Sequence, residues 1–160
     1  MKIRQVRIND LEQLISLENT GFTPEEAATK QAFINRIETI PDTFLIAEEK
    51  DKIIGYVNGP VIPIPFITDD LFETTKANPN NGGYQSILGI VVAPGHQGKG
   101  IAGELLRSFE NQAREQGRLT VTLTCRQSLI PFYEKNGYVN QGISESQHGG
   151  IQWFTMNKRL

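Results

Sequence analysis

The sequence predicts an α/β domain of the α+β kind, in which about seven strands form a sheet and about four helices cover it. Apolar residues make up 38% of the 160 residues and charged residues 21%, the balance of a globular protein. The expected order is strand, two helices, three strands, helix, strand, helix and two strands. Residues 84–124 read as strand, helix and strand, a crossover that makes the two strands parallel neighbours. The length fits one domain, placed at residues 1–160.

The first part of the chain predicts a strand followed by two helices. Residues 2–8 alternate between apolar and polar side chains, as in a half-buried strand. Asn9 or Asp10 can cap a helix whose apolar residues recur at helical spacing. Residues 23–26, Thr-Pro-Glu-Glu, have the composition of a capping box. They predict that a second helix starts there and runs to about Arg36.

A hairpin and a long irregular segment follow. Residues 43–48 and 52–58 read as strands joined by a short polar turn. Residues 59–83 are rich in proline, glycine and asparagine, with a short helix expected near 69–75. Loops of this length in compact domains are often functional. We place no domain boundary here, because neither flank could hold a core alone.

The remaining elements are a central strand, a helix and shorter pieces. Residues 84–92 become apolar on both faces, as in a central strand. Residues 101–116 form an amphipathic helix that Gly117 ends. The pattern then predicts a strand at 119–124, a short helix at 128–135, and strands at 138–142 and 151–157.

Composition excludes several classes of function. The net charge is −2 and no basic run occurs, so we expect no nucleic-acid partner. No apolar stretch reaches membrane length and no signal core is present, so we expect no membrane partner. Cys125 is the only cysteine, which excludes an internal disulfide and fits a cytoplasmic location. With His96 and His148 as the only histidines, we expect no metal site.

A glycine turn lies between the central strand and the amphipathic helix. Residues 97–102 read Gln-Gly-Lys-Gly-Ile-Ala, and such a turn directs free backbone N–H groups at one point, as for a phosphate. It is not a Walker A loop, because no hydroxyl residue follows Lys99. Residues 98–103 match the dinucleotide fingerprint by letter only, because the preceding strand lies mid-chain and no acidic residue follows at the end of the next strand. An ordinary glycine-rich loop is the alternative on this evidence alone.

Two motifs make the chain resemble the GNAT superfamily of acetyl-CoA-dependent N-acetyltransferases. Gln97, Gly100 and Ala102 match the signature of Gln or Arg, two residues, Gly, one residue, and Gly or Ala, which here follows Val-Ala-Pro at 92–94. Residues 129–138 look like a second signature, Phe-Tyr-x-x-x-Gly-Phe. Within the superfamily the chain is most similar to the arylalkylamine N-acetyltransferases. The resemblance implies a mixed, mostly antiparallel sheet whose central parallel pair splays around the cofactor, with Gly89 as the candidate start of the splay.

The resemblance also implies acetyl-CoA as the cosubstrate. Its pyrophosphate would lie on the backbone N–H groups of the glycine turn, and its pantetheine arm would pair with the central strand like an added strand. The expected binding residues are Ile90, Val91, Val92, Gln97, Gly98, Lys99, Gly100, Ile101, Ala102 and Gly103.

Acyl transfer from a thioester to an amine needs a base, a donor to the oxyanion and an acid for the thiolate. The resemblance assigns the oxyanion contact to a backbone N–H near Ile90 and the acid to Tyr133. The arylalkylamine enzymes carry two histidines on the central strand, where this chain has Ser86 and Leu88. Leu88 cannot move protons, and Ser86 could at best hold a water. The catalytic candidates are therefore Tyr133 and Ser86.

The general base stays open at this stage. A carboxylate or a water chain from backbone carbonyls could serve, the carboxylate candidates being Glu25, Glu26, Asp69 and Asp70. His148 is a further candidate base, but it lies in an expected hairpin turn and is expected to be a surface residue, and His96 flanks the glycine turn. Cys125 is expected to be packed rather than to carry an acetyl group.

The acceptor is expected to enter beside residues 21–28 and 59–83. An apolar slot there could include Phe22, Phe66, Phe72 and Trp153. The first hypothesis is that acetyl-CoA acetylates the primary amine of a small molecule by direct attack. The alternatives are acetylation of a protein or peptide amine, and a non-catalytic module that senses coenzyme A. A homodimer is possible.

Overall fold

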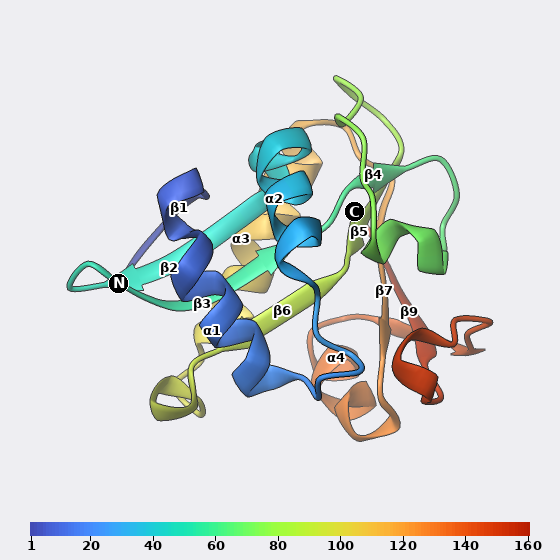
Figure 1. Cartoon of the computed structure of the whole chain (residues 1–160). Coiled ribbons are helices and arrows are strands. Elements are labelled where there is room, and N and C mark those ends of the chain that lie inside the picture. The colour runs from blue at the N-terminus through green and yellow to red at the C-terminus, as the bar shows by residue number, and fades with distance from the viewer.

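Two β-sheets organise the fold, and residues 84–92 contribute one strand to each (Figure 1). The computed structural model describes residues 1–160. The first sheet has the order β1 (Lys2–Gln5), β2 (Phe44–Glu49), β3 (Lys52–Asn58) and β6 (Gly89–Val92). The second has the order β4 (Val61–Ile62), β5 (Tyr84–Ile87), β7 (Thr120–Cys125), β9 (Phe154–Arg159) and β8 (Val139–Ile143). All neighbouring strands are antiparallel except β5 and β7, as the predicted mixed architecture requires.

The parallel pair is the crossover predicted for residues 84–124. Tyr84 lies opposite Thr120, and Ile87 lies opposite Leu123. Helix α3 (Ile101–Glu115) lies between β6 and β7 in the chain. Gly117 follows it with a φ of 71°, a left-handed conformation that ends a helix without strain.

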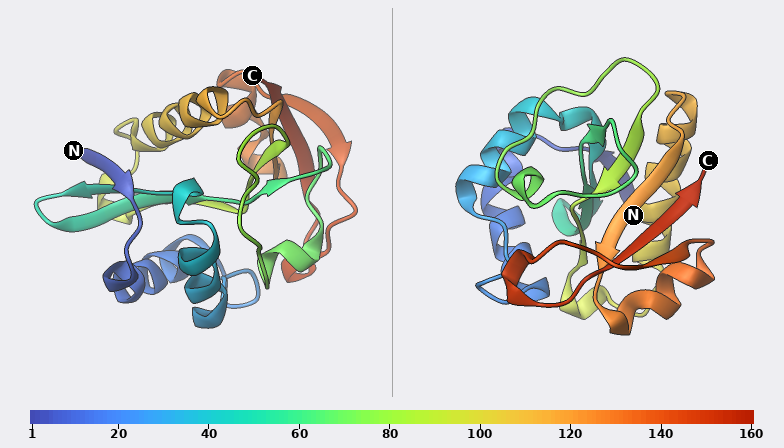
Figure 2. Two further views of the ribbon diagram at one scale, coloured as in Figure 1. Left: turned by 90° about the horizontal axis from the view of Figure 1, so that it is seen from above. Right: turned by 90° about the vertical axis from the view of Figure 1, so that its right-hand side faces the viewer.

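Helices cover both faces of the four-stranded sheet (Figure 2). Helices α1 (Leu11–Gly21) and α2 (Lys30–Thr39) lie on one face and α3 on the other, while α4 (Ile130–Lys135) packs beside β8 and β9. Because side chains alternate along a strand, Ile46 belongs to the α1–α2 core and Leu45 to the α3 core. No helix has both the length and the apolar composition that a membrane crossing would need.

The predicted single strand at 84–92 is wrong. The chain pairs with β7 up to Ile87 and with β3 from Gly89, so Leu88 marks a change of sheet. The amide of Ser86 still donates to the Pro60 carbonyl at 3.0 Å, whereas the amide of Leu88 donates to the Asn58 carbonyl at 2.8 Å. Gly89 therefore begins the part of the chain that diverges from β7, the place predicted for the splay.

The predicted capping box at 23–26 is also wrong. Residues 23–28 form turns, and α2 begins at Lys30 with Thr29 as its cap, whose hydroxyl accepts from the Ala32 amide at 3.1 Å. The reason is that Glu26 is buried and its carboxylate pairs with Arg126 instead of capping a helix. The segment between α1 and α2 is thus a largely exposed loop in which Glu26 alone is buried.

Residues 59–83 are largely irregular, as predicted. They contain only β4 and a 3-10 turn at Asp69–Phe72, within the range expected for a short helix. The predicted hairpin at 49–52 is confirmed, with Lys50 and Asp51 both at positive φ, as a tight two-residue turn requires.

Candidate active site

A cavity opens where β6 and β7 diverge. Strand β6 has β3 as its only neighbour in the first sheet, so its other edge lies free beside β7. The cavity has a volume of about 570 Å³ and is lined by residues from both strands, from α1, α2 and α4, and from the loops around them. One of its walls is therefore a strand edge with unpaired backbone groups.

The free edge of β6 presents the backbone of Ile90 and Val92. The Ala93 amide donates to the Ile54 carbonyl at 2.8 Å, and Val91 lies opposite Tyr56. Because backbone groups of an antiparallel strand alternate in direction, the groups of the even residues point away from β3. Gln97 confirms this direction, since its side-chain amide donates to the Val92 carbonyl at 3.1 Å. Apart from the Val92 carbonyl that Gln97 contacts, the outward backbone groups of Ile90 and Val92 face the side on which an extended ligand could pair, as the pantetheine arm of coenzyme A would require.

The glycine turn lies at one end of this edge. Gly98 and Gly100 have φ values of 77° and 82°, and Gly100 is the residue from which α3 starts. The first amides of a helix have no partner within it, so they form an anion site together with the helix dipole. Lys99 is exposed, and Ile101 is buried in the core. The strand edge and the turn therefore fit the arm and the pyrophosphate of one coenzyme A molecule.

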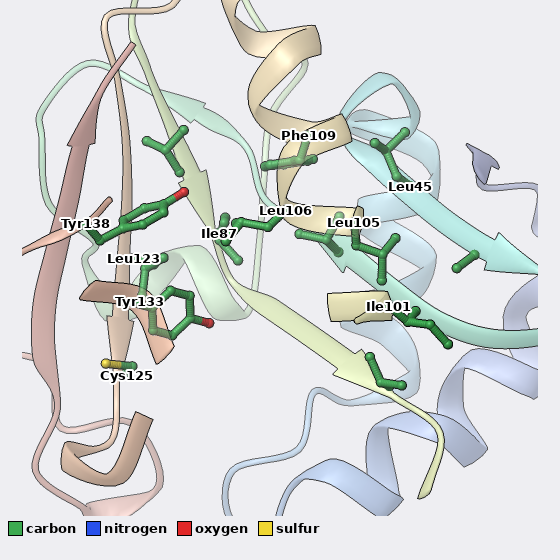
Figure 3. Packing of buried hydrophobic residues seen from close by; sticks show 14 of the residues in the cluster. Leu45, Ile87, Ile101, Leu105, Leu106, Phe109, Leu123, Cys125, Tyr133 and Tyr138 are labelled. Atoms are coloured by element: carbon green, nitrogen blue, oxygen red, sulfur yellow. The ribbon is translucent and has the colours of Figure 1, made fainter. Parts of the chain in front are cut away.

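Tyr133 on α4 lines the cavity from the β7 side. Its ring packs edge-on against Phe132 and Tyr138, with centroids 5.0 and 5.6 Å away, and only 4% of the residue is exposed. Its hydroxyl makes no hydrogen bond with the protein and points into the gap towards β6 (Figure 3). Burial, with a smaller contribution from Cys125, raises the pKa of Tyr133, so the phenol stays protonated at neutral pH.

His148 lines the same cavity and is half-buried, which contradicts its prediction as a surface residue. Its ring stacks on Phe72 with centroids 4.1 Å apart, and its Nε2 lies 2.7 Å from the Glu26 carbonyl. A carbonyl only accepts, so Nε2 carries the hydrogen and Nδ1 carries the lone pair in the neutral ring. Burial lowers the pKa of His148, outweighing Asp69, so the neutral form is favoured. Trp153 donates to the His148 carbonyl at 2.7 Å and holds the turn in place.

Two further charged side chains, Glu18 and Arg36, line the same cavity and were missed by the sequence analysis. The carboxylate of Glu18 accepts from the Tyr56 hydroxyl and, at 2.7 Å, from the Ala28 amide. Burial raises the pKa of Glu18. Arg36 is 2% exposed and donates to the Phe72 carbonyl at 3.0 Å. Both occupy helix positions that pattern analysis assigns to an ordinary amphipathic surface, so only the tertiary structure reveals them.

Ser86 is not a cavity residue, which corrects its place among the catalytic candidates. Its hydroxyl donates to the Pro60 carbonyl at 2.6 Å in a fully buried position. The break at Leu88 explains this, because Ser86 still belongs to the five-stranded sheet while the cavity begins beyond it. Leu88, by contrast, lines the cavity.

The carboxylates proposed as bases are separated by the fold. Glu26 lines the cavity, but its Oε1 accepts from Thr23 and pairs with Arg126. Asp69 accepts from the Ser146 hydroxyl and the Gln147 amide, which fixes the turn that carries His148. The other two carboxylate candidates, Glu25 and Asp70, are exposed and do not line the cavity.

The apolar slot forms in part. Phe22, Phe72 and Trp153 line the cavity, whereas Phe66 is 49% exposed and lines a separate surface cleft. Cys125 lines the cavity, and burial raises the pKa of its thiol to about 11, which keeps it a weak nucleophile at neutral pH.

Comparison with known proteins agrees with this arrangement. A family model described as acetyltransferase (GNAT) family matches residues 8–138. A GphF GNAT-like decarboxylase in complex with isobutyryl-CoA superposes with a TM-score of 0.85 at 17% identity, over 99% of each chain. Ard1 from Thermoplasma volcanium has a TM-score of 0.76 at 20% identity, over 99% of this chain and 97% of its own. An aminoglycoside 6'-N-acetyltransferase complexed with coenzyme A has a TM-score of 0.73 at 17% identity, over 99% of this chain and 97% of its own. At these identities the solved structures establish the shared fold alone.

Proposed function

The chain belongs to the GNAT family of acetyltransferases, which use acetyl-CoA, and we propose that it acetylates the primary amine of a small molecule. The observation that carries this proposal is the aromatic lining of the cavity beside the free edge of β6. Phe22, Phe72, His148 and Trp153 belong to that lining, and Asp69 links the segment that carries Phe72 to the turn that carries His148. Such a lining fits a compact amine with an apolar body.

The free edge of β6 positions the thioester and stabilises its carbonyl oxygen. The outward amide of Ile90 is a fixed donor at the cavity wall, and it requires no reorganisation when negative charge develops on that oxygen. Acetyl-CoA, when bound, supplies the acyl group and the thiolate that leaves.

His148 is the general base in this proposal. Its Nδ1 lone pair takes the proton from the amine, whose nitrogen then forms the bond to the acetyl carbon. The Nε2 hydrogen bond to the Glu26 carbonyl holds the ring in the required tautomer, and the lowered pKa keeps it neutral. The base therefore comes from the turn before β9, whereas the arylalkylamine enzymes use the strand positions that Ser86 and Leu88 occupy here.

Tyr133 is the general acid. Its free hydroxyl donates its hydrogen to the sulfur as the carbon–sulfur bond breaks, and the phenol regains a proton from solvent after product leaves. His148 and Tyr133 line one cavity, where the amine and the thioester would meet.

An acceptor panel tests the proposal. Release of free thiol from acetyl-CoA is measured with arylalkylamines, alkylamines and peptides that carry a free α-amine. We expect turnover with the small amines to exceed that with peptides. Turnover with peptides alone would favour a protein acetyltransferase. Tight acetyl-CoA binding without turnover on any amine would favour a sensor.

A further inference from the structure

Arg36 is a buried cation without a partner of opposite charge. Arg36 is one of the residues that line the cavity, only 2% of it is exposed, and no carboxylate lies within the 4.0 Å of an ion pair. Its two hydrogen bonds go to neutral oxygens, the Asn58 side chain at 3.3 Å and the Phe72 carbonyl at 3.0 Å. A buried charge of this kind is costly unless something neutralises it.

Neighbouring carboxylates do not fill this role. The carboxylate of Glu18 acts on Arg36 electrostatically, but its two oxygens accept hydrogen bonds from the Tyr56 hydroxyl and the Ala28 amide. The Nε of Arg36 is buried with no acceptor, and so is the Nδ2 of Asn58 beside it. The charge of Glu18 therefore acts on Arg36 from a distance, but the cavity wall offers the Arg36 Nε no hydrogen-bond acceptor.

A second residue of the cavity lining, Glu26, has an unmatched group of the opposite kind. The Oε2 of Glu26 is buried without a donor, while its Oε1 is held by Thr23 and Arg126. Phe72 contacts Arg36 through its carbonyl, and His148 contacts Glu26 through Nε2. The residues that line the cavity thus include one unfilled donor, on Arg36, and one unfilled acceptor, on Glu26.

We propose that Arg36 is a carboxylate subsite and that the acceptor is an α-amino acid with an apolar side chain. This inference rests on the proposed function and names its substrate class. The carboxylate would pair with the planar N–H fork of Arg36, and the Glu26 oxygen would attract the ammonium as it enters. Arg36 contacts Asn58, which lies opposite Gly89, so the subsite is next to the strand that would hold the thioester. Phe22 and Trp153 would contact the apolar side chain.

The carboxylate could instead belong to the acyl group of the donor, because both substrates meet at this point. The test separates the two sources. Phenylalanine and phenethylamine are compared as acceptors, since they differ only in the carboxylate. Acetyl-CoA and succinyl-CoA are compared as donors to phenethylamine. Each is measured as kcat/KM by thiol release and by mass detection of the acylated amine.

We expect kcat/KM for phenylalanine to exceed that for phenethylamine by roughly 10- to 100-fold, the range of a charge-assisted hydrogen bond to a buried cation. In Arg36→Gln that ratio should fall towards one, while Arg36→Lys should keep part of it. Equal rates for the two acceptors, or a faster rate for phenethylamine, would overturn the inference. A comparable preference for succinyl-CoA would move the carboxylate to the donor and would also overturn it.

A binding measurement protects the test against a variant that fails to fold. Trp153 is the only tryptophan and lines the cavity, so its fluorescence reports acceptor binding to the unaltered protein. The dissociation constant of phenylalanine should be at least about tenfold lower than that of phenethylamine. Equal constants would overturn the inference. Failure of the proposed function looks different, because then neither acceptor would be acylated by any donor.

Discussion

Tyr133 and Tyr138 provide a matched pair of variants that separates catalysis from stability. The two rings contact each other edge-on at 5.6 Å, and both residues are at most 4% exposed. Their hydroxyls differ in whether they have a hydrogen-bond partner. Tyr133 has no hydrogen-bond partner, whereas Tyr138 donates to Glu110 Oε2 at 2.7 Å within a cluster that also includes Lys158. Replacement of each tyrosine by phenylalanine therefore removes the same atom from two different environments.

For Tyr133→Phe we expect a large loss of rate and a small loss of stability. No hydrogen bond of the protein is lost, so the free energy of unfolding should change by less than about 1 kcal/mol. Removal of a general acid should lower kcat by roughly 10²- to 10⁴-fold. The reverse holds for Tyr138→Phe, which leaves a buried carboxylate oxygen unpaired. That variant should lose about 1.5–3 kcal/mol of stability and keep its kcat.

The assay combines steady-state kinetics at saturating substrates with urea unfolding of the same three proteins. A kcat of Tyr133→Phe equal to that of the wild type across the pH range would refute the assignment of Tyr133 as the general acid. A stability loss in Tyr133→Phe as large as that in Tyr138→Phe would also refute the reasoning, because it would mean that the Tyr133 hydroxyl has a structural partner.

The other predictions concern the turn, the base and the cysteine. Gly100→Ala should raise the KM for acetyl-CoA roughly tenfold, because a φ of 82° costs a non-glycine residue about 1–2 kcal/mol. The control is Gly95→Ala, which should leave the KM within about twofold because Gly95 has open space around it and no positive φ. Equal effects of the two substitutions would contradict the account. The wild-type rate should fall at acidic pH, as His148 becomes protonated below its lowered pKa, to which Asp69, Glu18 and Arg36 also contribute. His148→Gln should lower kcat and remove this acidic decrease in rate. An unchanged pH profile in that variant would exclude His148 as the general base. Cys125→Ala should keep turnover within an order of magnitude of the wild type, and its double-reciprocal plots of initial rate should intersect, as for direct transfer. Parallel lines in the wild type would instead indicate an acetyl-cysteine intermediate.

Local sequence patterns predicted most elements because their signals are short-range. The hairpin at 49–52 and the strand–helix–strand crossover each depend on neighbours in sequence. The errors arose where a long-range contact overrode a local signal. Glu26 has the spacing of a capping residue, but Arg126, distant in sequence, takes its carboxylate. Leu88 continues an apolar run, and only the pairing of Asn58 with Gly89 shows that the chain changes sheets there.

The candidate site divides in the same way. The glycine turn and Tyr133 are marked by motifs, because a helix start and a short helix are local structures. His148 has no such marker. Its role depends on Phe72 and Glu26, which come from two other loops, and the Gln-His-Gly-Gly sequence alone resembles an exposed turn. Arg36 likewise becomes unusual only because the fold brings no carboxylate within ion-pair distance.

The central claim is direct transfer of acetyl from acetyl-CoA to a small amine in the cavity between β6 and β7. A quenched-flow single turnover, analysed by mass spectrometry of the amine, the coenzyme and the intact protein, tests it most directly. The account predicts that acetylated amine and free coenzyme thiol appear together in equal amounts, with no acetylated protein at any time. Thiol release without acetylated amine, or acetyl on the protein before the amine is modified, would contradict it.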